Sequence, residues 1–170
     1  IYNWLNSVLH GDYAATAIPA GLIESTTGAD GVDNNILGNA NRKKGSRTDL
    51  QTMATKFKRS NRWFEGKMHC LLTPQMEAEM FPANDIVTAT YMQNVTEAER
   101  RAGVVYKAYG WNIMVRSSVA IIGDGGNTVL APGEAAVAAD DEASLFWYEG
   151  AVEFAMGSIE PFFKYKDPNN

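Results

Sequence analysis

Apolar residues recur at helical spacing soon after residue 47 and predict one amphipathic helix there. The stripe consists of Leu50, Met53, Ala54 and Phe57. Basic side chains lie between these positions, which suits a helix with one buried and one solvated face. Thr48 and Gln51 have the spacing of a capping box, in which two side chains satisfy free amides of the first turn. We therefore expect a helix over residues 49–61.

The next apolar run, residues 67–72, predicts a short buried strand. It is followed by Thr73 and Pro74, a pair that favours a helix start because Thr is a good cap and Pro suits the first helical position. This second helix should end at Pro82, because proline cannot continue it.

The middle of the chain predicts an irregular stretch and then two paired strands. Residues 85–93 show no clear period, so we expect no regular element there. Residues 96–99 form a second capping-box candidate at the start of a short helical turn. Residues 104–106 and 111–116 predict two strands that meet at Gly110, and the alternation in the second is typical of a sheet covered on one face.

The two ends of the chain predict fewer elements. Residues 1–9 carry an apolar stripe that indicates the end of a helix, and residues 14–45, rich in Gly, Asn and Thr, predict a long ordered connection. Residues 123–127 are typical of a turn. Residues 144–148 and 151–156 predict two further strands.

The composition is that of a folded protein with a core of its own: 170 residues, of which 45% are hydrophobic and 21% charged. The predicted core is Leu50, Met53, Phe57, Cys70, Leu72, Met76, Trp111, Ile113 and Val115. A single cysteine excludes a disulfide scaffold. No apolar run reaches the ~18 residues that a membrane span needs. The first residues lack the basic and apolar regions of a signal peptide.

Charge is distributed unevenly, although the formal net charge is only −5. Residues 42–67 hold nine basic and two acidic residues, whereas residues 117–163 hold eight acids and no Lys or Arg. The acidic total argues against nucleic acid as the main ligand, but the basic segment and its aromatic residues keep a nucleic-acid-binding module open. The split itself indicates either two solvated faces or electrostatic matching between copies of the chain.

No group of side chains in the sequence indicates an enzyme. His69 and Cys70 are neighbours on a predicted strand, so their side chains should point to opposite faces. The potential ligands lack the spacing of a zinc or iron site. Glu77 and Glu79, or the acids at 140–142, could pair in a hydrolase, but they lie in polar surroundings. We expect no catalytic residue, no metal and no cofactor.

The order of the segments carries more information than any single motif. A helix end closing at Gly11-Asp12 is followed by residues 17–22 and by the capped helix of residues 49–61. The strand and helix start of residues 63–74 come next, and then a short helix, a variable loop and the strand pair of residues 103–118. This succession resembles the major capsid protein of tailed bacteriophages, the Hong Kong 97-type shell protein. The resemblance covers roughly residues 1–163 and rests on order and spacing.

The resemblance implies an α+β fold of the Hong Kong 97 type. Residues 1–47 would be the end of a spine helix and a connection in the peripheral domain. Residues 48–142 would form the axial domain, with a central mixed or antiparallel sheet flanked by helices. Residues 143–170 would return to the peripheral domain as long strands. We expect the chain to be a fragment of a longer subunit, without the N-terminal arm and the C-terminal part.

The implied function is structural and non-enzymatic: self-assembly into pentamers and hexamers of an icosahedral phage head that encloses double-stranded DNA. The partners would be copies of the same chain, with scaffolding, portal or decoration proteins and non-specific contact with packaged DNA, and no membrane. The expected location is the virion capsid, assembled in the host cytoplasm. An encapsulin-type bacterial compartment shares the implied fold and remains an alternative, and a nucleic-acid-binding module is a further one.

Two sets of charged residues are the candidates for contacts between subunits. The first pairs a basic with an acidic cluster: Arg42, Lys43, Lys44 and Arg47 with Asp140, Asp141 and Glu142. The second lies in residues 81–103, which match the family's loop at the tip of the axial domain. Its members are Glu97, Glu99, Arg100 and Arg101. Opposite charges on successive copies would form a ring there; a local helical Glu–Arg pair is the alternative.

Overall fold

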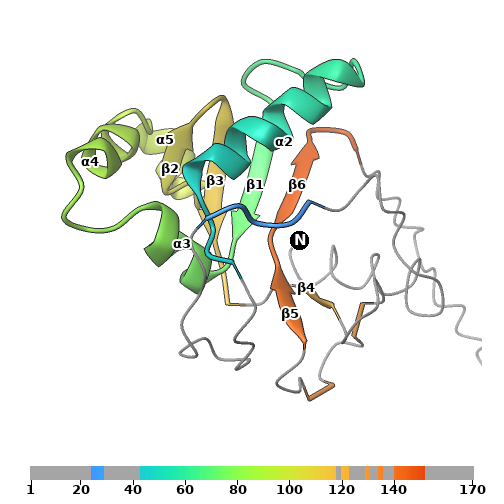
Figure 1. Ribbon diagram of the computed structural model, residues 1–170. Coiled ribbons are helices and arrows are strands. Elements are labelled where there is room, and N and C mark those ends of the chain that lie inside the picture. The colour runs from blue at the N-terminus through green and yellow to red at the C-terminus, as the bar shows by residue number, and fades with distance from the viewer. Residues whose placement is uncertain are drawn as a thin grey trace, which may run out of the picture.

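The computed structural model describes residues 24–28, 43–117, 120–122, 129–130, 134–135 and 140–151 (Figure 1). These residues form an α+β structure. Its elements are, in chain order, α2 (Arg47–Arg59), β1 (Met68–Leu72), α3 (Pro74–Met80), α4 (Ile86–Gln93), α5 (Glu97–Arg101), β2 (Tyr106–Ala108), β3 (Trp111–Val115), β4 (Ala120–Ile122), β5 (Asp141–Ala143) and β6 (Leu145–Tyr148).

A four-stranded mixed sheet organises the described residues, with the strand order β2-β3-β1-β6. β1 is parallel to β3, and both outer pairings are antiparallel. In the register, Cys70 lies between Ile113 and Phe146. β4 and β5 form a separate antiparallel pair. The domain boundary expected between residues 142 and 143 falls within β5. After it, β6 forms the edge strand of the larger sheet and pairs with the inner strand β1.

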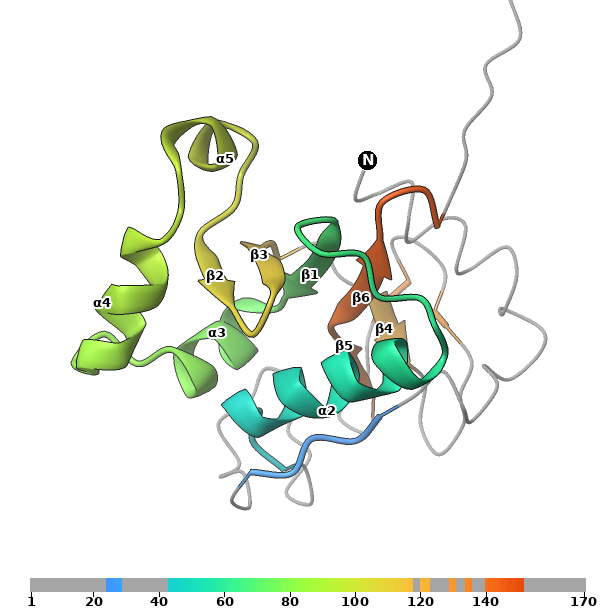
Figure 2. The same cartoon turned by 90° about the horizontal axis from the view of Figure 1, so that it is seen from above.

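One face of the sheet carries the main core and is covered by α2 (Figure 2). The predicted core residues are confirmed: each is either buried in this cluster or packed against it. The indole of Trp111 lies at its centre, edge-on to the rings of Phe57, Trp63 and Phe146. Together with the buried Leu50 and Ala54, Phe57 packs α2 against the sheet.

The opposite face of the sheet is also covered, so the expectation of a half-covered strand over residues 111–116 was wrong. Met114 and Leu71 form a second buried cluster with Val95 and Val104. The two valines flank α5, and the crossover from β1 to β3 brings them behind the sheet. Asn112 is buried on this side, and its side-chain amide is satisfied there by donating to the carbonyl oxygen of Gly66 at 3.0 Å.

Side-chain caps set the helix starts, and two of the three predicted ones are confirmed. The Thr73 hydroxyl accepts from the Met76 amide at 3.0 Å, and Pro74 begins α3. Thr96 and Glu99 form the capping box of α5. The capping box expected at Thr48 and Gln51 was wrong. Ser46 caps α2 instead, in a capping box closed by Asp49, whose carboxylate accepts from the Ser46 amide at 2.8 Å.

The expectation of an irregular stretch over residues 85–93 was also wrong, because α4 occupies it. Asp85 begins the helix: its carboxylate accepts from the Val87 amide at 2.9 Å. The inner side of α4 then packs through the buried Thr88 and through Tyr91, whose ring lies edge-on to Phe81 at 6.0 Å. Cap and packing together outweigh a sequence whose β-branched residues carry little helical preference.

The turn between β2 and β3 confirms that the two strands meet at Gly110. Tyr109 and Gly110 both have positive φ, at 52° and 84°, as a two-residue hairpin turn of the primed type requires. A Cβ atom at Gly110 would lie 2.5 Å from the Trp63 ring, so close approach also requires glycine here. The first strand lies slightly later than the expected residues 104–106.

The later strand predicted at residues 144–148 is confirmed as β6. Four other expectations lie wholly or largely outside the described residues. They are the helix end at 1–9, most of the connection at 14–45, the turn at 123–127, and the strand at 151–156 beyond its first residue.

Candidate functional site

In the predicted basic cluster of Arg42, Lys43, Lys44 and Arg47, the side chain of Arg47 has a partner within the chain. Its guanidinium forms an ion pair with the carboxylate of Asp85, which links the first turn of α2 to the start of α4. Lys43 is exposed, and the backbone of Lys44 accepts a hydrogen bond from the Gly28 amide at 3.0 Å. Arg42 lies outside the described residues.

Asp85 therefore serves two elements at once. The pKa of its carboxyl group is lowered, first by the hydrogen bond from the Val87 amide and then by the side chain of Arg47. Because both interactions favour the ionised form, Asp85 is a charged cap on α4 and a fixed partner of α2. This pair positions α4 relative to the rest of the fold.

The charged residues of α5 also have partners within the chain. Arg101 lies 3.3 Å from the Glu97 carboxylate, four residues earlier on the helix, which is the local pair named above as the alternative to a ring between copies. Arg100 donates to the carbonyl oxygen of Met92 at 3.1 Å. Both interactions are exposed, and such pairs contribute little to stability.

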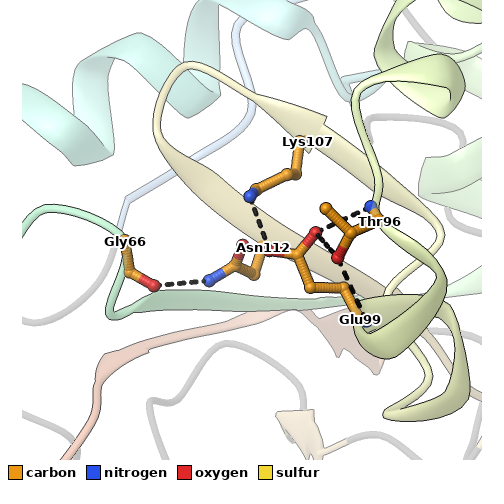
Figure 3. A network of polar contacts seen from close by, with 5 residues as sticks. All are labelled: Gly66, Thr96, Glu99, Lys107 and Asn112. Atoms are coloured by element: carbon orange, nitrogen blue, oxygen red, sulfur yellow. Dashed lines mark hydrogen bonds and ion pairs between the residues drawn. The ribbon is translucent and has the colours of Figure 1, made fainter.

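Glu99 is the most strongly held of these side chains (Figure 3). Its carboxylate accepts from the Lys107 ammonium at 2.6 Å and from the backbone and hydroxyl of Thr96 at 2.8 and 2.7 Å. The hydrogen bond from Lys107 is the largest cause that lowers the Glu99 pKa to about 2. The network joins α5 to β2 and so restrains the position of α5 relative to the sheet.

The predicted acidic cluster does not form one exposed patch. Asp140 is only 3% exposed, so its carboxylate is not on the surface of this chain. Glu142 lies on β5, is partly buried, and has one carboxylate oxygen, Oε2, without a hydrogen-bond partner. The backbone of Asp141 lies in β5, opposite Ile122.

Three of the remaining basic residues near α2 have partners within the chain. Lys56 forms an ion pair with Glu24, and Lys67 lies 3.8 Å from Glu149. The Lys58 ammonium lies 4.7 Å from the centre of the Trp63 ring, a cation–π contact. Arg59 and Arg62, at and just after the end of α2, are exposed, so only part of this basic strip is neutralised by other side chains.

The side chains considered for catalysis have structural partners. Cys70 is fully buried, which raises the pKa of its thiol. His69 points to the other face and stacks on Trp147 at 5.6 Å, and burial lowers its pKa. Glu77 accepts from the Tyr106 hydroxyl at 2.8 Å. Within the described ranges, no three His, Cys, Asp or Glu side chains gather as metal ligands.

Sequence reasoning missed the exposed apolar side chains. The large ones among the described residues are Ile86 (84% exposed), Phe64 (45%), Met92 (44%) and Val87 (39%). Three of them lie on α4, and no residue of that helix is charged. Eight consecutive uncharged residues after Asp85 were the available signal, hidden by the absence of a helical period. Around the helix these three side chains lie roughly 100–140° apart, so they do not form one apolar face.

No helix in the part of the chain that the structure describes is long and apolar enough to cross a membrane. Comparison of the chain with protein-family models, with curated proteins and with solved structures finds no match.

Proposed function

We propose that this chain is a shell protein of the Hong Kong 97 type, whose copies assemble into a closed particle. The observation that carries the proposal is the segment formed by α4 and α5. It stands out from the body of the fold beside β2, at one end of the sheet (Figures 1 and 2). A projecting segment with apolar side chains turned to solvent is suited to contact a neighbouring molecule.

The order of the elements supports the proposal. A capped helix, a buried strand, a helix that starts at Thr73-Pro74, a projecting segment and the hairpin at Gly110 follow one another in the succession expected of an axial domain. The α+β class and the mixed sheet agree with that expectation. Cys70, His69 and Glu77 are each packed or hydrogen-bonded within the chain, and this supports a structural role for them.

Some of the charged candidates are placed to contact a neighbouring copy. Lys43, Arg100 and Arg101 are exposed and can meet acids of a neighbouring copy, but each such pair contributes only about 0–1 kcal/mol. Over the many equivalent contacts of a shell, small contributions add up, and they weaken with salt.

The test is expression of the complete gene, followed by analytical ultracentrifugation and electron microscopy. We expect closed, uniform particles in the megadalton range. Particles that contain DNA when the protein is made together with the other phage proteins support the capsid assignment. Particles that contain a protein cargo support an encapsulin-type compartment. A protein that remains a small species at all concentrations, and binds nucleic acid or turns over a substrate, contradicts the proposal.

A further inference from the structure

Arg59 and Arg62 differ from the other arginines that the structure describes, because their side chains have no partner. Both are exposed, and within the described part of the chain neither guanidinium takes part in an ion pair or a hydrogen bond. The other four described arginines each donate to a carboxylate or a carbonyl oxygen of the chain: Arg47, Arg100, Arg101 and Arg116. Two guanidinium groups that the fold itself does not use are therefore available to a ligand.

The two arginines stand on a fixed turn at the end of α2. Arg59 is the last residue of the helix. Asn61 then has the left-handed backbone conformation, with φ at 55°, and the Arg62 amide donates to the Phe57 carbonyl oxygen at 2.9 Å. This arrangement is a Schellman end of a helix. Because the backbone of both arginines is already held, little backbone entropy is lost when their side chains bind a ligand.

The segment that carries the two arginines has a positive excess. Residues 58–67 are exposed except for Trp63, which is partly buried. They hold four cations and one acid, Glu65, whose carboxylate accepts from the Trp63 indole at 3.0 Å. A second acid, Glu149, lies 3.8 Å from Lys67. These two carboxylates leave the charges of the α2 end only partly balanced, so an anion is favoured there.

The chemistry of this segment favours phosphate groups over the carboxylates of a second copy. A guanidinium group binds a phosphate through two parallel hydrogen bonds. The acidic run of the chain offers no exposed match among the described residues, because Asp140 is buried and Glu142 is partly buried. Phe64, in the same segment, is 45% exposed. An aromatic ring near exposed cations is typical of surfaces that contact the sugars and bases of nucleic acid.

The end of α2 lies on the side of the molecule away from α4, as Figures 1 and 2 both show. It is therefore separate from the projecting segment proposed for contacts between copies. We infer that Arg59 and Arg62, together with Lys58, bind the phosphate backbone of nucleic acid without regard to base sequence. The inference rests on the proposed function for the source of that nucleic acid, which is the DNA that the shell encloses.

The salt dependence of binding tests the inference. Full-length protein, kept below the concentration at which it assembles, is titrated into labelled duplex DNA and into a single strand of the same sequence. Fluorescence anisotropy gives the affinity at salt concentrations between roughly 20 and 200 mM. Combining Arg59→Gln with Arg62→Gln should weaken binding at least about tenfold at the lowest salt concentration. It should also reduce the slope of log affinity against log salt for duplex DNA by about 1.8, because each phosphate contact contributes about 0.9.

Three matched variants serve as controls. Arg116→Gln removes an exposed arginine just after β3, at the opposite end of the sheet, and should leave affinity and slope unchanged. Arg59→Lys with Arg62→Lys keeps both charges and should keep the slope. Phe64→Ala should weaken binding of the single strand more than that of the duplex, because only unpaired bases can stack on the ring. Cations at a helix end also stabilise the helix, so a urea titration records any folding defect of the double variant, which by itself does not change a salt slope.

The outcomes separate this inference from the proposed function. Unchanged affinity and slope in the double Gln variant overturn the inference and leave the shell function standing. Polyglutamate that binds more tightly than DNA, and is released by the same variant, also overturns it, since the surface then fits an acidic protein. A double variant that binds DNA like the parent but forms no shells makes the arginines contacts between copies and overturns the inference. Binding with the expected slopes by a chain that never assembles supports the inference and contradicts the shell function.

Discussion

The indole Nε1 of Trp111 donates a hydrogen bond to the backbone carbonyl oxygen of Leu50, at 3.0 Å. Trp111 lies on β3 and Leu50 in the first turn of α2, 61 residues apart, and both are fully buried. A tryptophan that buries its ring needs a partner for its N–H, and here the partner is the helix that covers the sheet. This bond therefore fixes the position of α2 along the strands.

Trp111→Phe should destabilise the protein by about 2 kcal/mol, because it removes this hydrogen bond and leaves a small cavity. The free energy of unfolding from a urea titration measures the effect. Trp63→Phe is the matched control: its indole bonds to the exposed Glu65, so we expect a loss below about 1 kcal/mol. Equal losses for the two variants would contradict the role assigned to the Leu50 carbonyl.

Gly110→Ala should cost about 2–4 kcal/mol, because the new Cβ combines a positive φ with a 2.5 Å approach to the Trp63 ring. Gly66→Ala is the control. Gly66 also has a positive φ, at 75°, but nothing lies within 4 Å of its Cβ position, so only backbone strain of about 1–2 kcal/mol is expected. Thermal unfolding of both variants gives the change in melting temperature, and the difference between the two changes measures the effect of the contact with Trp63.

Stability should fall in acid partly through Glu99. Its pKa is lowered to about 2 from an ordinary value near 4.5, so its contribution is present above pH 4.5 and is lost as the pH falls towards 2. Glu99→Gln should flatten the dependence of unfolding free energy on pH in this range. Glu97→Gln, in an exposed pair on the same helix, should leave the slope close to that of the parent. A slope unchanged by Glu99→Gln argues against the Lys107 contact.

Asp85→Ala should loosen α4, since it removes both the helix cap and the partner of Arg47. We expect a lower free energy of unfolding and faster hydrogen exchange in residues 86–93. Asp85→Asn separates the two effects, because asparagine caps well but carries no charge. It should retain most of the protection of α4. If Asp85→Asn exchanges as fast as Asp85→Ala, the ion pair with Arg47 is the stronger restraint.

Most of the central fold follows from local signals in the sequence. The Thr73-Pro74 start, the Thr96 box and the turn at Gly110 depend on neighbouring residues, and each is confirmed. α4 has a local start signal in Asp85, but its residues show no helical period, and the packing of Tyr91 against Phe81 is a tertiary contact that local patterns do not reveal.

The charged site candidates show the same limit. Sequence composition places Asp140 in an acidic run, but its burial depends on how the chain folds around it. In the same way, Arg47 stands within a basic run, and its partner Asp85 is 38 residues away. Charge counts along a chain therefore describe neither burial nor pairing.

The parallel pairing of β1 with β3 also shapes how the protein folds. Leu71 of β1 pairs with Met114 on one side and with Leu145 on the other. Both edges of β1 therefore pair with strands that come much later in the chain. Closing such long loops costs entropy before any contact offsets it, which slows folding. During synthesis on the ribosome, β1 has its full set of neighbours only after residue 148 has emerged. Until then its backbone edges are open, and this interval is when the nascent chain is most exposed to mispairing with other copies.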